Sequence, residues 1–135
     1  MINKPKSFTK AQLDDLYFIK GTRPPYFQGT IKMGKFVKFG ETSTIGTAVE
    51  VCQGSKIGAN SRVRDNVKIG IGTQIKSHVK IGVGTEIGDF CDIKTKATIG
   101  EEATIEDGVV IESGVKIPDG AVIEEGSVVT LNTKL

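Results

Sequence analysis

The feature that most constrains the fold of this chain is a six-residue period. Starting at Phe27, every sixth residue as far as Leu135 is large and apolar, and no insertion interrupts the series. A smaller residue stands two positions before most of these, with a polar residue between them, which is the alternation of a strand with one buried face. Gly or Asn recurs three positions after the large residue, where a left-handed backbone can turn a corner. Each hexad is therefore predicted to form one short strand and one corner.

Short strands joined by corners at constant spacing predict a solenoid, in which each coil buries an apolar ridge against the next. From Phe27 to the C-terminus the pattern resembles the hexapeptide-repeat proteins. That resemblance implies a left-handed parallel β-helix whose triangular coils each contain three hexads, or 18 residues. The predicted fold is all-β: a single-domain left-handed parallel β-helix solenoid of about six triangular coils, with a short N-terminal capping helix.

Residues 1–26 precede the repeat and are predicted to form a capping segment, and residues 27–135 the β-helix. Thr9 and Gln12 have the spacing of a capping box, so a helix over Phe8–Ile19 is expected, and "GTRPP" at residues 21–25 should end it. We expect this helix to cover the open strands of the first coil rather than to lie on a membrane. Its predicted apolar side comprises Leu13, Leu16, Tyr17 and Ile19.

Composition agrees with one compact domain, since 38% of the 135 residues are hydrophobic and 25% are charged. The opening "MINKPKSFTK" lacks the apolar core of a secretion signal, and no apolar run approaches the ~20 residues of a membrane span. We therefore expect no membrane partner and a cytoplasmic location, or an intracellular assembly of a virus. Cys52 and Cys91 fall at different hexad positions, so a disulfide is not expected.

Charge is distributed unevenly along the chain. The net charge is +2, but residues 1–96 hold 16 basic and 8 acidic groups, a balance of +8, while residues 97–135 hold 2 basic and 8 acidic groups, a balance of −6. The basic residues are spread over several faces without interleaved aromatic residues, so no nucleic-acid partner is expected.

Residues 103–130 are similar in their spacing to the C-terminal coils of small sugar and xenobiotic acetyltransferases, and "GSVVT" at residues 126–130 is the closest local match. The resemblance implies acetyl-coenzyme A as a substrate, a homotrimer, and a histidine as general base. His78 is the only histidine, so it is the one candidate for that base. The three-histidine zinc site of the γ-class carbonic anhydrases cannot be built, and no metal is expected.

Three observations argue against catalysis. His78 stands at a corner position with no carboxylate in its hexad to orient it. No hexad carries the extended loop with which relatives support such a histidine. An acidic strip containing Glu106, Glu112 and Glu124 would oppose the phosphates of the coenzyme. We therefore favour a non-catalytic oligomeric scaffold or interaction module without a cofactor, a structural part of a larger assembly or virion. The alternative is an acetyl-coenzyme A-dependent acyltransferase acting on a sugar or small amine, with His78 as base.

Apolar residues at outward positions predict contact between chains, because they fall in lines along the solenoid. We expect a homotrimer. The last coil, residues 118–135, should leave its strand edge unpaired, so a protein partner or another copy is expected to dock there. The predicted interface residues are Phe36, Ile71, Phe90, Val110, Val122 and Val128.

Overall fold

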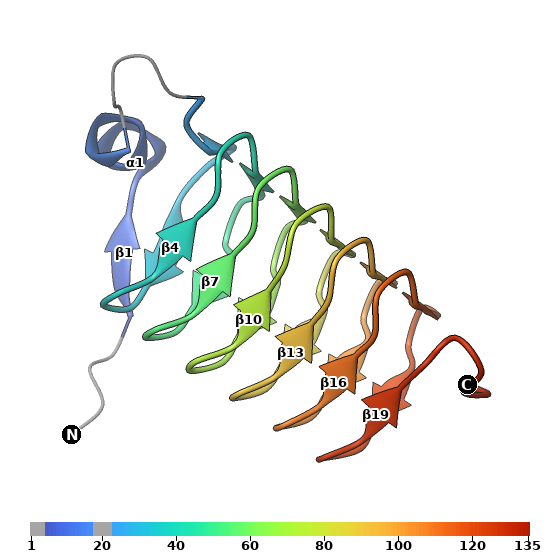
Figure 1. Ribbon diagram of the computed structural model, residues 1–135. Helices are drawn as coiled ribbons and strands as arrows, with labels where there is room; N and C mark the ends of the chain where they lie inside the picture. The colour runs from blue at the N-terminus through green and yellow to red at the C-terminus, as the bar shows by residue number, and fades with distance from the viewer. Residues whose placement is uncertain (1–4, 18–22) are drawn as a thin grey trace.

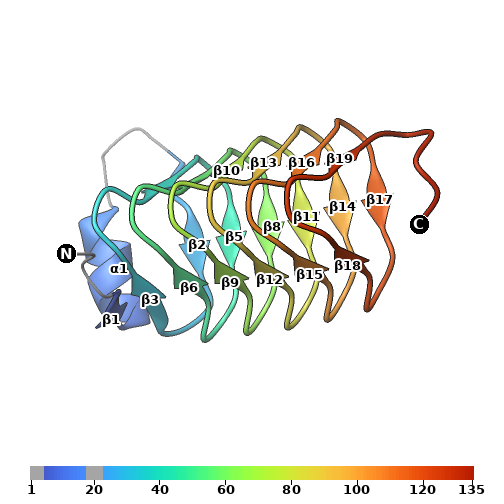
Figure 2. The same ribbon diagram turned by 90° about the horizontal axis from the view of Figure 1, so that it is seen from below.

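The computed structural model describes residues 5–17 and 23–135, which form one helix and three sheets of short strands. The sheets make the three faces of a long prism, with the coils stacked along its axis (Figures 1 and 2). Sheet A contains β1 (Lys6–Phe8), β3 (Ile31–Met33), β6 (Glu50–Val51), β9 (Lys68–Ile69), β12 (Glu86–Ile87), β15 (Thr104–Ile105) and β18 (Val122–Ile123). Sheet B contains β2 (Tyr26–Phe27), β5 (Thr44–Ile45), β8 (Arg62–Val63), β11 (Lys80–Ile81), β14 (Thr98–Ile99) and β17 (Lys116–Ile117). Sheet C contains β4 (Lys38–Phe39), β7 (Lys56–Ile57), β10 (Gln74–Ile75), β13 (Asp92–Ile93), β16 (Val110–Ile111) and β19 (Val128–Val129).

The predicted parallel β-solenoid of about six coils is confirmed. Each repeat strand pairs in parallel with the strand 18 residues further along, so that Ile75 lies between Ile57 and Ile93 in sheet C. The large residue of every hexad from Phe27 to Val129 is buried, apart from the half-buried Phe39, whereas Leu135 is exposed. The six-residue period therefore defines one continuous core.

Buried hydroxyl groups join successive coils inside this core. The Thr73 hydroxyl donates to the Gly88 carbonyl oxygen at 2.7 Å and accepts from the Cys91 amide at 3.2 Å. Ser55 bonds in the same way to residues of the neighbouring coils. Because these positions are fully buried, each hydroxyl satisfies backbone groups that water cannot reach.

The corners adopt the left-handed backbone that the Gly and Asn residues predicted. Several larger residues adopt it as well, although a left-handed conformation costs an L-residue roughly 1–2 kcal/mol. The A–C corner follows the strands of sheet A, with positive φ at Phe36, Gly54, Gly72, Phe90, Gly108 and Gly126. The C–B corner follows sheet C, with positive φ at Thr42, Asn60, His78, Lys96 and Gly114. The B–A corner follows sheet B, with positive φ at Ala48, Asn66, Gly84, Glu102 and Gly120.

Helix α1 (Lys10–Leu16) begins as predicted. The Gln12 amide donates to the Thr9 hydroxyl at 3.2 Å, and the Thr9 amide donates to the Gln12 side chain at 2.8 Å, which completes the capping box. The helix is shorter than expected, because it ends at Leu16, and Leu16 is exposed rather than part of the apolar side. Ile19, the other end of the predicted helix, lies outside the described residues.

The apolar side of α1 packs on the first coil. Leu13 is fully buried, and the Tyr17 ring lies 5.4 Å from the ring of Phe27 and 5.6 Å from that of Phe39. The helix therefore covers the end of the core at sheets B and C, as a cap should.

Strand β1 was not predicted from the sequence. It pairs antiparallel with β3, with Ser7 opposite Lys32, and so occupies the edge of sheet A at the end where α1 lies (Figure 1). The expectation that the helix alone shields the N-terminal edge is therefore wrong for sheet A. At the opposite end β17, β18 and β19 are the last strands of their sheets, and residues 131–135 are exposed. Within the described residues, no helix has the length and apolar character to cross a membrane.

Candidate functional site

His78 projects from the C–B corner into solvent. Its backbone is left-handed, with φ of 62°, and its amide donates to the Ala59 carbonyl oxygen at 3.0 Å. The side chain is exposed, and no hydrogen bond joins the imidazole to any residue in the described part of the chain. The ring is therefore accessible to a ligand, but nothing within one copy of the chain orients it.

The acidic tail does not form one strip. Residues that are close in sequence reach different edges, because the chain turns a corner every six residues. The expected acidic strip is wrong for this reason. Of the eight acidic residues after residue 96, Glu106, Asp107, Glu124 and Glu125 lie at the A–C corner, Glu101, Glu102 and Asp119 at the B–A corner, and Glu112 alone at the C–B corner.

Part of this acidic charge has a structural role. Asp107 accepts a hydrogen bond from the Asp89 amide at 2.7 Å, and Asp119 accepts one from the Glu101 amide at 2.7 Å. Both bonds join a corner to the corner one coil earlier. These carboxylates hold the coils together and are directed at backbone groups rather than at a ligand.

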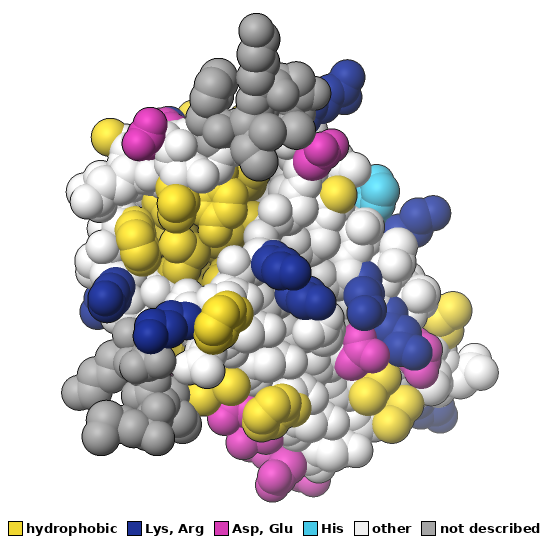
Figure 3. Space-filling model, turned by 60° about the vertical axis from the view of Figure 1, so that its left-hand side comes forward, with side chains coloured by type: hydrophobic (Ala, Val, Ile, Leu, Met, Phe, Trp, Pro, Cys, Tyr) yellow, Lys and Arg dark blue, Asp and Glu magenta, His cyan; other side chains and the backbone are white. Residues whose placement is uncertain are grey.

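The corner that carries His78 is basic. Lys76, Lys94 and Lys96 stand in the same coil or the next, and Lys94 makes an ion pair of 3.6 Å with Glu112. Figure 3 shows the histidine with a Lys or Arg side chain close by and more of them lower on the same face, although an acidic side chain also lies near it. A larger group of acidic side chains gathers at the bottom of the view. The edge around His78 therefore attracts anions, in contrast to the other two corners of the C-terminal half.

Next to this corner, sheet C has a hollow of about 480 Å³, which we call the lysine hollow. Lys38, Lys56 and Lys76 line it, together with the hydroxyl residues Ser77 and Thr95, and no acidic residue does. Two further lining residues are the glycines Gly40 and Gly58, where a Cβ would collide with the backbone of the next coil. The hollow is positively charged and adjoins His78.

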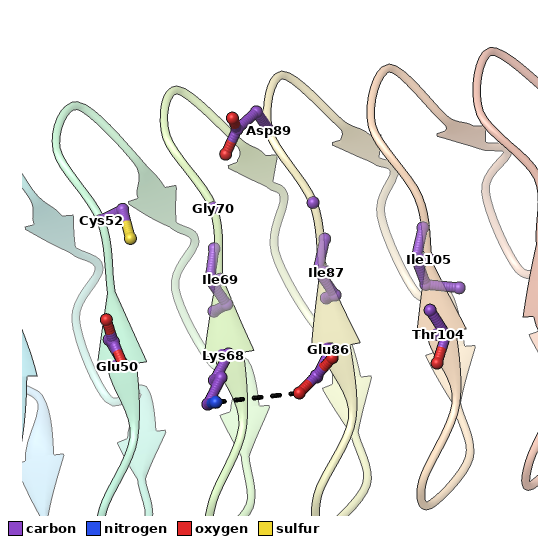
Figure 4. Close-up of a pocket in the computed structure, with 11 residues that line it drawn as sticks. Glu50, Cys52, Lys68, Ile69, Gly70, Glu86, Ile87, Asp89, Thr104 and Ile105 are labelled. Atoms are coloured by element: carbon purple, nitrogen blue, oxygen red, sulfur yellow. Dashed lines mark ion pairs between the residues drawn. The ribbon is translucent and has the colours of Figure 1, made fainter.

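Sheet A has a hollow of about 390 Å³ with a different character (Figure 4). Glu50, Lys68, Glu86 and Asp89 line it, and Lys68 pairs with Glu86 at 3.8 Å, so charges of both signs meet there. Burial, and then the carboxylates of Glu50 and Asp89, raise the pKa of the Cys52 thiol in this hollow. A raised pKa disfavours the thiolate, which is the nucleophilic form of this side chain.

The predicted interface residues fall into three groups. Phe36, Ile71 and Phe90 lie at the A–C corner, where the Phe90 ring packs over Gly72 and leaves no room for a Cβ there. Val110 pairs directly with Val128 on sheet C. Val122 is exposed on sheet A, apart from the other valines. The structure therefore brings Ile71 next to Phe90 and Val110 next to Val128, but it does not form one surface containing all six residues.

Sequence reasoning missed Asp92, which lies on sheet C between Gln74 and Val110. Its Oδ1 atom is buried and has no hydrogen-bond partner in the described part of the chain. The hexad pattern places Asp92 outward but says nothing of how deeply it sits. For metals, residues 5–17 and 23–135 contain no group of three His, Cys, Asp or Glu side chains that could hold an ion.

The comparisons with known proteins agree with the repeat. The family model described as bacterial transferase hexapeptide (six repeats) matches residues 96–130, and no curated protein matches the chain by sequence. The predicted resemblance to the hexapeptide-repeat proteins is confirmed by this match together with the solenoid.

Among solved structures, the chain is similar to perosamine N-acetyltransferase from Caulobacter crescentus, solved with coenzyme A and GDP-perosamine. The TM-score is 0.74 at 16% identity, over 79% of this chain and 51% of that one. The acetyltransferase domain of PglB from Neisseria gonorrhoeae gives 0.70 at 16% identity, over 81% and 50%. A hexapeptide transferase family protein from Anaplasma phagocytophilum gives 0.63 at 19%, over 77% and 72%. The chain thus matches about half the length of the first two.

These findings correct our functional interpretation. The favoured hypothesis, a non-catalytic scaffold, is wrong, because the similar structures include acetyltransferases, one of them solved with coenzyme A. The physical objection to the alternative is also weaker than expected, since the acidic residues lie mainly at two corners and leave the His78 corner basic.

Proposed function

We propose that this chain is an acyltransferase that moves an acetyl group from acetyl-coenzyme A to the amine or hydroxyl group of a sugar or small amine. The observation that carries the proposal is an accessible histidine on a basic edge: His78 is exposed at the C–B corner, among Lys76, Lys94 and Lys96. The similarity to acetyltransferases supports the reaction class.

His78 acts as the general base. It accepts a proton from the acceptor's amine or hydroxyl as that group attacks the thioester carbonyl carbon, which forms the new amide or ester bond. The carbon–sulfur bond breaks, and the proton held by His78 leaves with the sulfur of coenzyme A. The imidazole is free to do this because it makes no hydrogen bond within one copy of the chain, as far as the described residues go.

The lysines near His78 supply the attraction for the cofactor. Coenzyme A carries several negative charges on its phosphates, and ammonium groups bind phosphate by charge-assisted hydrogen bonds. Lys76 and Lys96 form no ion pair among the described residues, so their ammonium groups are available. Placing the coenzyme along this edge also keeps its phosphates away from the acidic A–C and B–A corners.

An acetyl-transfer assay tests the proposal. The protein is incubated with acetyl-coenzyme A and a set of amino sugars and small amines, and release of the free thiol is followed. The variant His78→Asn should lower kcat/KM about 100-fold or more, because general bases contribute that much, while Asn tolerates the left-handed backbone that His78 adopts.

The matched control is Glu102→Asn, which makes the same kind of change at another left-handed corner position, with φ of 54°, on the B–A corner. It should keep the activity of the natural protein. The proposal is wrong if no acceptor increases thiol release by the natural protein, or if His78→Asn transfers acetyl groups as fast as Glu102→Asn does.

A further inference from the structure

We propose that the lysine hollow on sheet C binds the diphosphate group of a nucleotide-type ligand. The hollow lies in the N-terminal half of the sheet, along β4, β7 and β10, and reaches the corner residue Ser77, which precedes His78. The identity of the ligand rests on the proposed function, whereas binding of the diphosphate itself does not.

Two lysines of sheet C stand in register with each other. Lys38 of β4 lies directly opposite Lys56 of β7, and Gln74 of β10 follows in the same outward row. Like charges at directly opposed positions of neighbouring strands destabilise a sheet. Neither lysine, nor Lys76 beside them, has a carboxylate within ion-pair distance among residues 5–17 and 23–135. An anion between the ammonium groups would remove the repulsion.

In the same coils, the outward charged residues of sheet A alternate in sign. Its outward row runs Lys32, Glu50, Lys68 and Glu86, with Lys32 opposite Glu50 and Glu50 opposite Lys68. There the charges alternate and compensate one another. Sheet B also places like charges in register, with Arg62 opposite Lys80, but the hollow beside Arg62 is lined by Asp65. The hollow of sheet C therefore differs from both others in having no carboxylate in its lining.

The size and chemistry of the hollow fit a diphosphate. Its volume of about 480 Å³ lies within the range of small-molecule sites, roughly 300–1,000 Å³. Three ammonium groups can neutralise the charge of two linked phosphates, and the hydroxyls of Ser77 and Thr95 add hydrogen-bond donors. The absence of a carboxylate from its lining removes the repulsion that an anion would meet in the hollow of sheet A.

Both substrates of the proposed reaction could supply this group. Coenzyme A contains a diphosphate, and so does a nucleotide-linked sugar such as the GDP-perosamine bound in the Caulobacter structure. The shared chemistry is a diphosphate next to a nucleoside. Because Ser77 lines the hollow, either ligand would extend from it towards His78.

Calorimetry on the full chain tests the site with three probes: inorganic pyrophosphate, coenzyme A and guanosine diphosphate. The double variant Lys38→Gln with Lys56→Gln should weaken binding of pyrophosphate at least about tenfold, because two charge-assisted contacts are lost. The matched control is Lys32→Gln with Lys68→Gln on sheet A, which removes the same net charge. It should bind pyrophosphate within about twofold of the natural protein, since it leaves the hollow unchanged.

Two binding results would overturn the proposal. In one, the natural protein binds none of the three probes at low ionic strength. In the other, the sheet A control weakens binding as much as the sheet C variant does, which would mean that net charge alone attracts the anion. If the sheet C variant loses more affinity for coenzyme A than for guanosine diphosphate, the diphosphate bound in the hollow is that of the coenzyme. If it loses more affinity for guanosine diphosphate, the bound diphosphate is that of a nucleotide-linked acceptor.

The transfer assay separates this proposal from the proposed function. Specific diphosphate binding at the hollow without any acetyl transfer would support the hollow and reject the enzyme. Acetyl transfer by the sheet C variant with unchanged KM for both substrates would support the enzyme and reject the hollow.

Discussion

At the scale of the residue, the corners set the chemistry that this solenoid can present. Each corner needs one left-handed residue, and Gly meets that need with the least strain. His78 and Lys96 occupy such positions in successive coils, with φ of 62° and 66°. A histidine in this conformation is held away from the core and cannot turn inward. The sequence indicated the corner position from the hexad count, but it could not show that the neighbouring faces are basic.

The strain at His78 leads to a prediction about stability. The change His78→Gly should raise the free energy of unfolding by about 1 kcal/mol, because Gly adopts positive φ without the Cβ conflict. The imidazole makes no hydrogen bond within the described chain, so little is lost in return. Urea denaturation of the variant measures this. A destabilised variant would show that the imidazole makes stabilising contacts, for example with another copy of the chain.

At the scale of the element, the repeat strands follow from the hexad period and the start of the helix from its capping box, whereas strand β1 follows from neither. The two-residue strands of all three sheets were predictable, because each buried large residue is fixed by the count of six. Strand β1 contains only Lys6–Phe8, outside the period, and it forms because the edge of β3 offers unpaired backbone groups. Such a pairing depends on a partner strand that lies far away in sequence.

The hydroxyl links between coils give a second prediction. The change Thr73→Val keeps the shape of the side chain but removes both its hydrogen bonds, to the Gly88 carbonyl and from the Cys91 amide. Because both backbone groups are then left without a partner in the core, unfolding free energy should fall by roughly 1–3 kcal/mol. Thr73→Ser, which keeps the hydroxyl, should lose less. Thermal denaturation compares the two, and equal losses would mean that the methyl group matters rather than the hydroxyl.

At the scale of the whole molecule, the solenoid distributes charged residues that are close in sequence around its three corners. From the sequence, the acidic residues of the tail were expected to form one strip. They lie at three different corners instead, because the chain passes to the next face of the prism every six residues. Counting charges along the chain therefore cannot predict where the charge lies on the surface unless each residue is first assigned to a face or corner of the prism. Sheet C then has two halves, with the lysine hollow at β4 to β10 and the valine pair at β16 and β19.

The C-terminal half of sheet C has the features of a contact between copies of the chain. Val110 and Val128 form an apolar row, and the buried Oδ1 of Asp92 beside Val110 has no partner among the described residues. A second copy would cover the valines and could donate a hydrogen bond to Asp92. Apolar association with one such polar contact is a common way to fix the geometry of an interface.

We therefore predict a homotrimer, the number of copies being the one that the family resemblance implies, with the C-terminal half of sheet C at the contact. Val128→Glu should dissociate it, because burying an unpaired carboxylate at an interface is unfavourable. Thr104→Glu adds the same charge at an outward position of sheet A and should leave the assembly intact. Light scattering coupled to gel filtration gives the mass of each variant. A monomer mass for the natural protein would reject the assembly. Dissociation by Thr104→Glu but not by Val128→Glu would move the contact to sheet A, where Val122 is the exposed apolar residue.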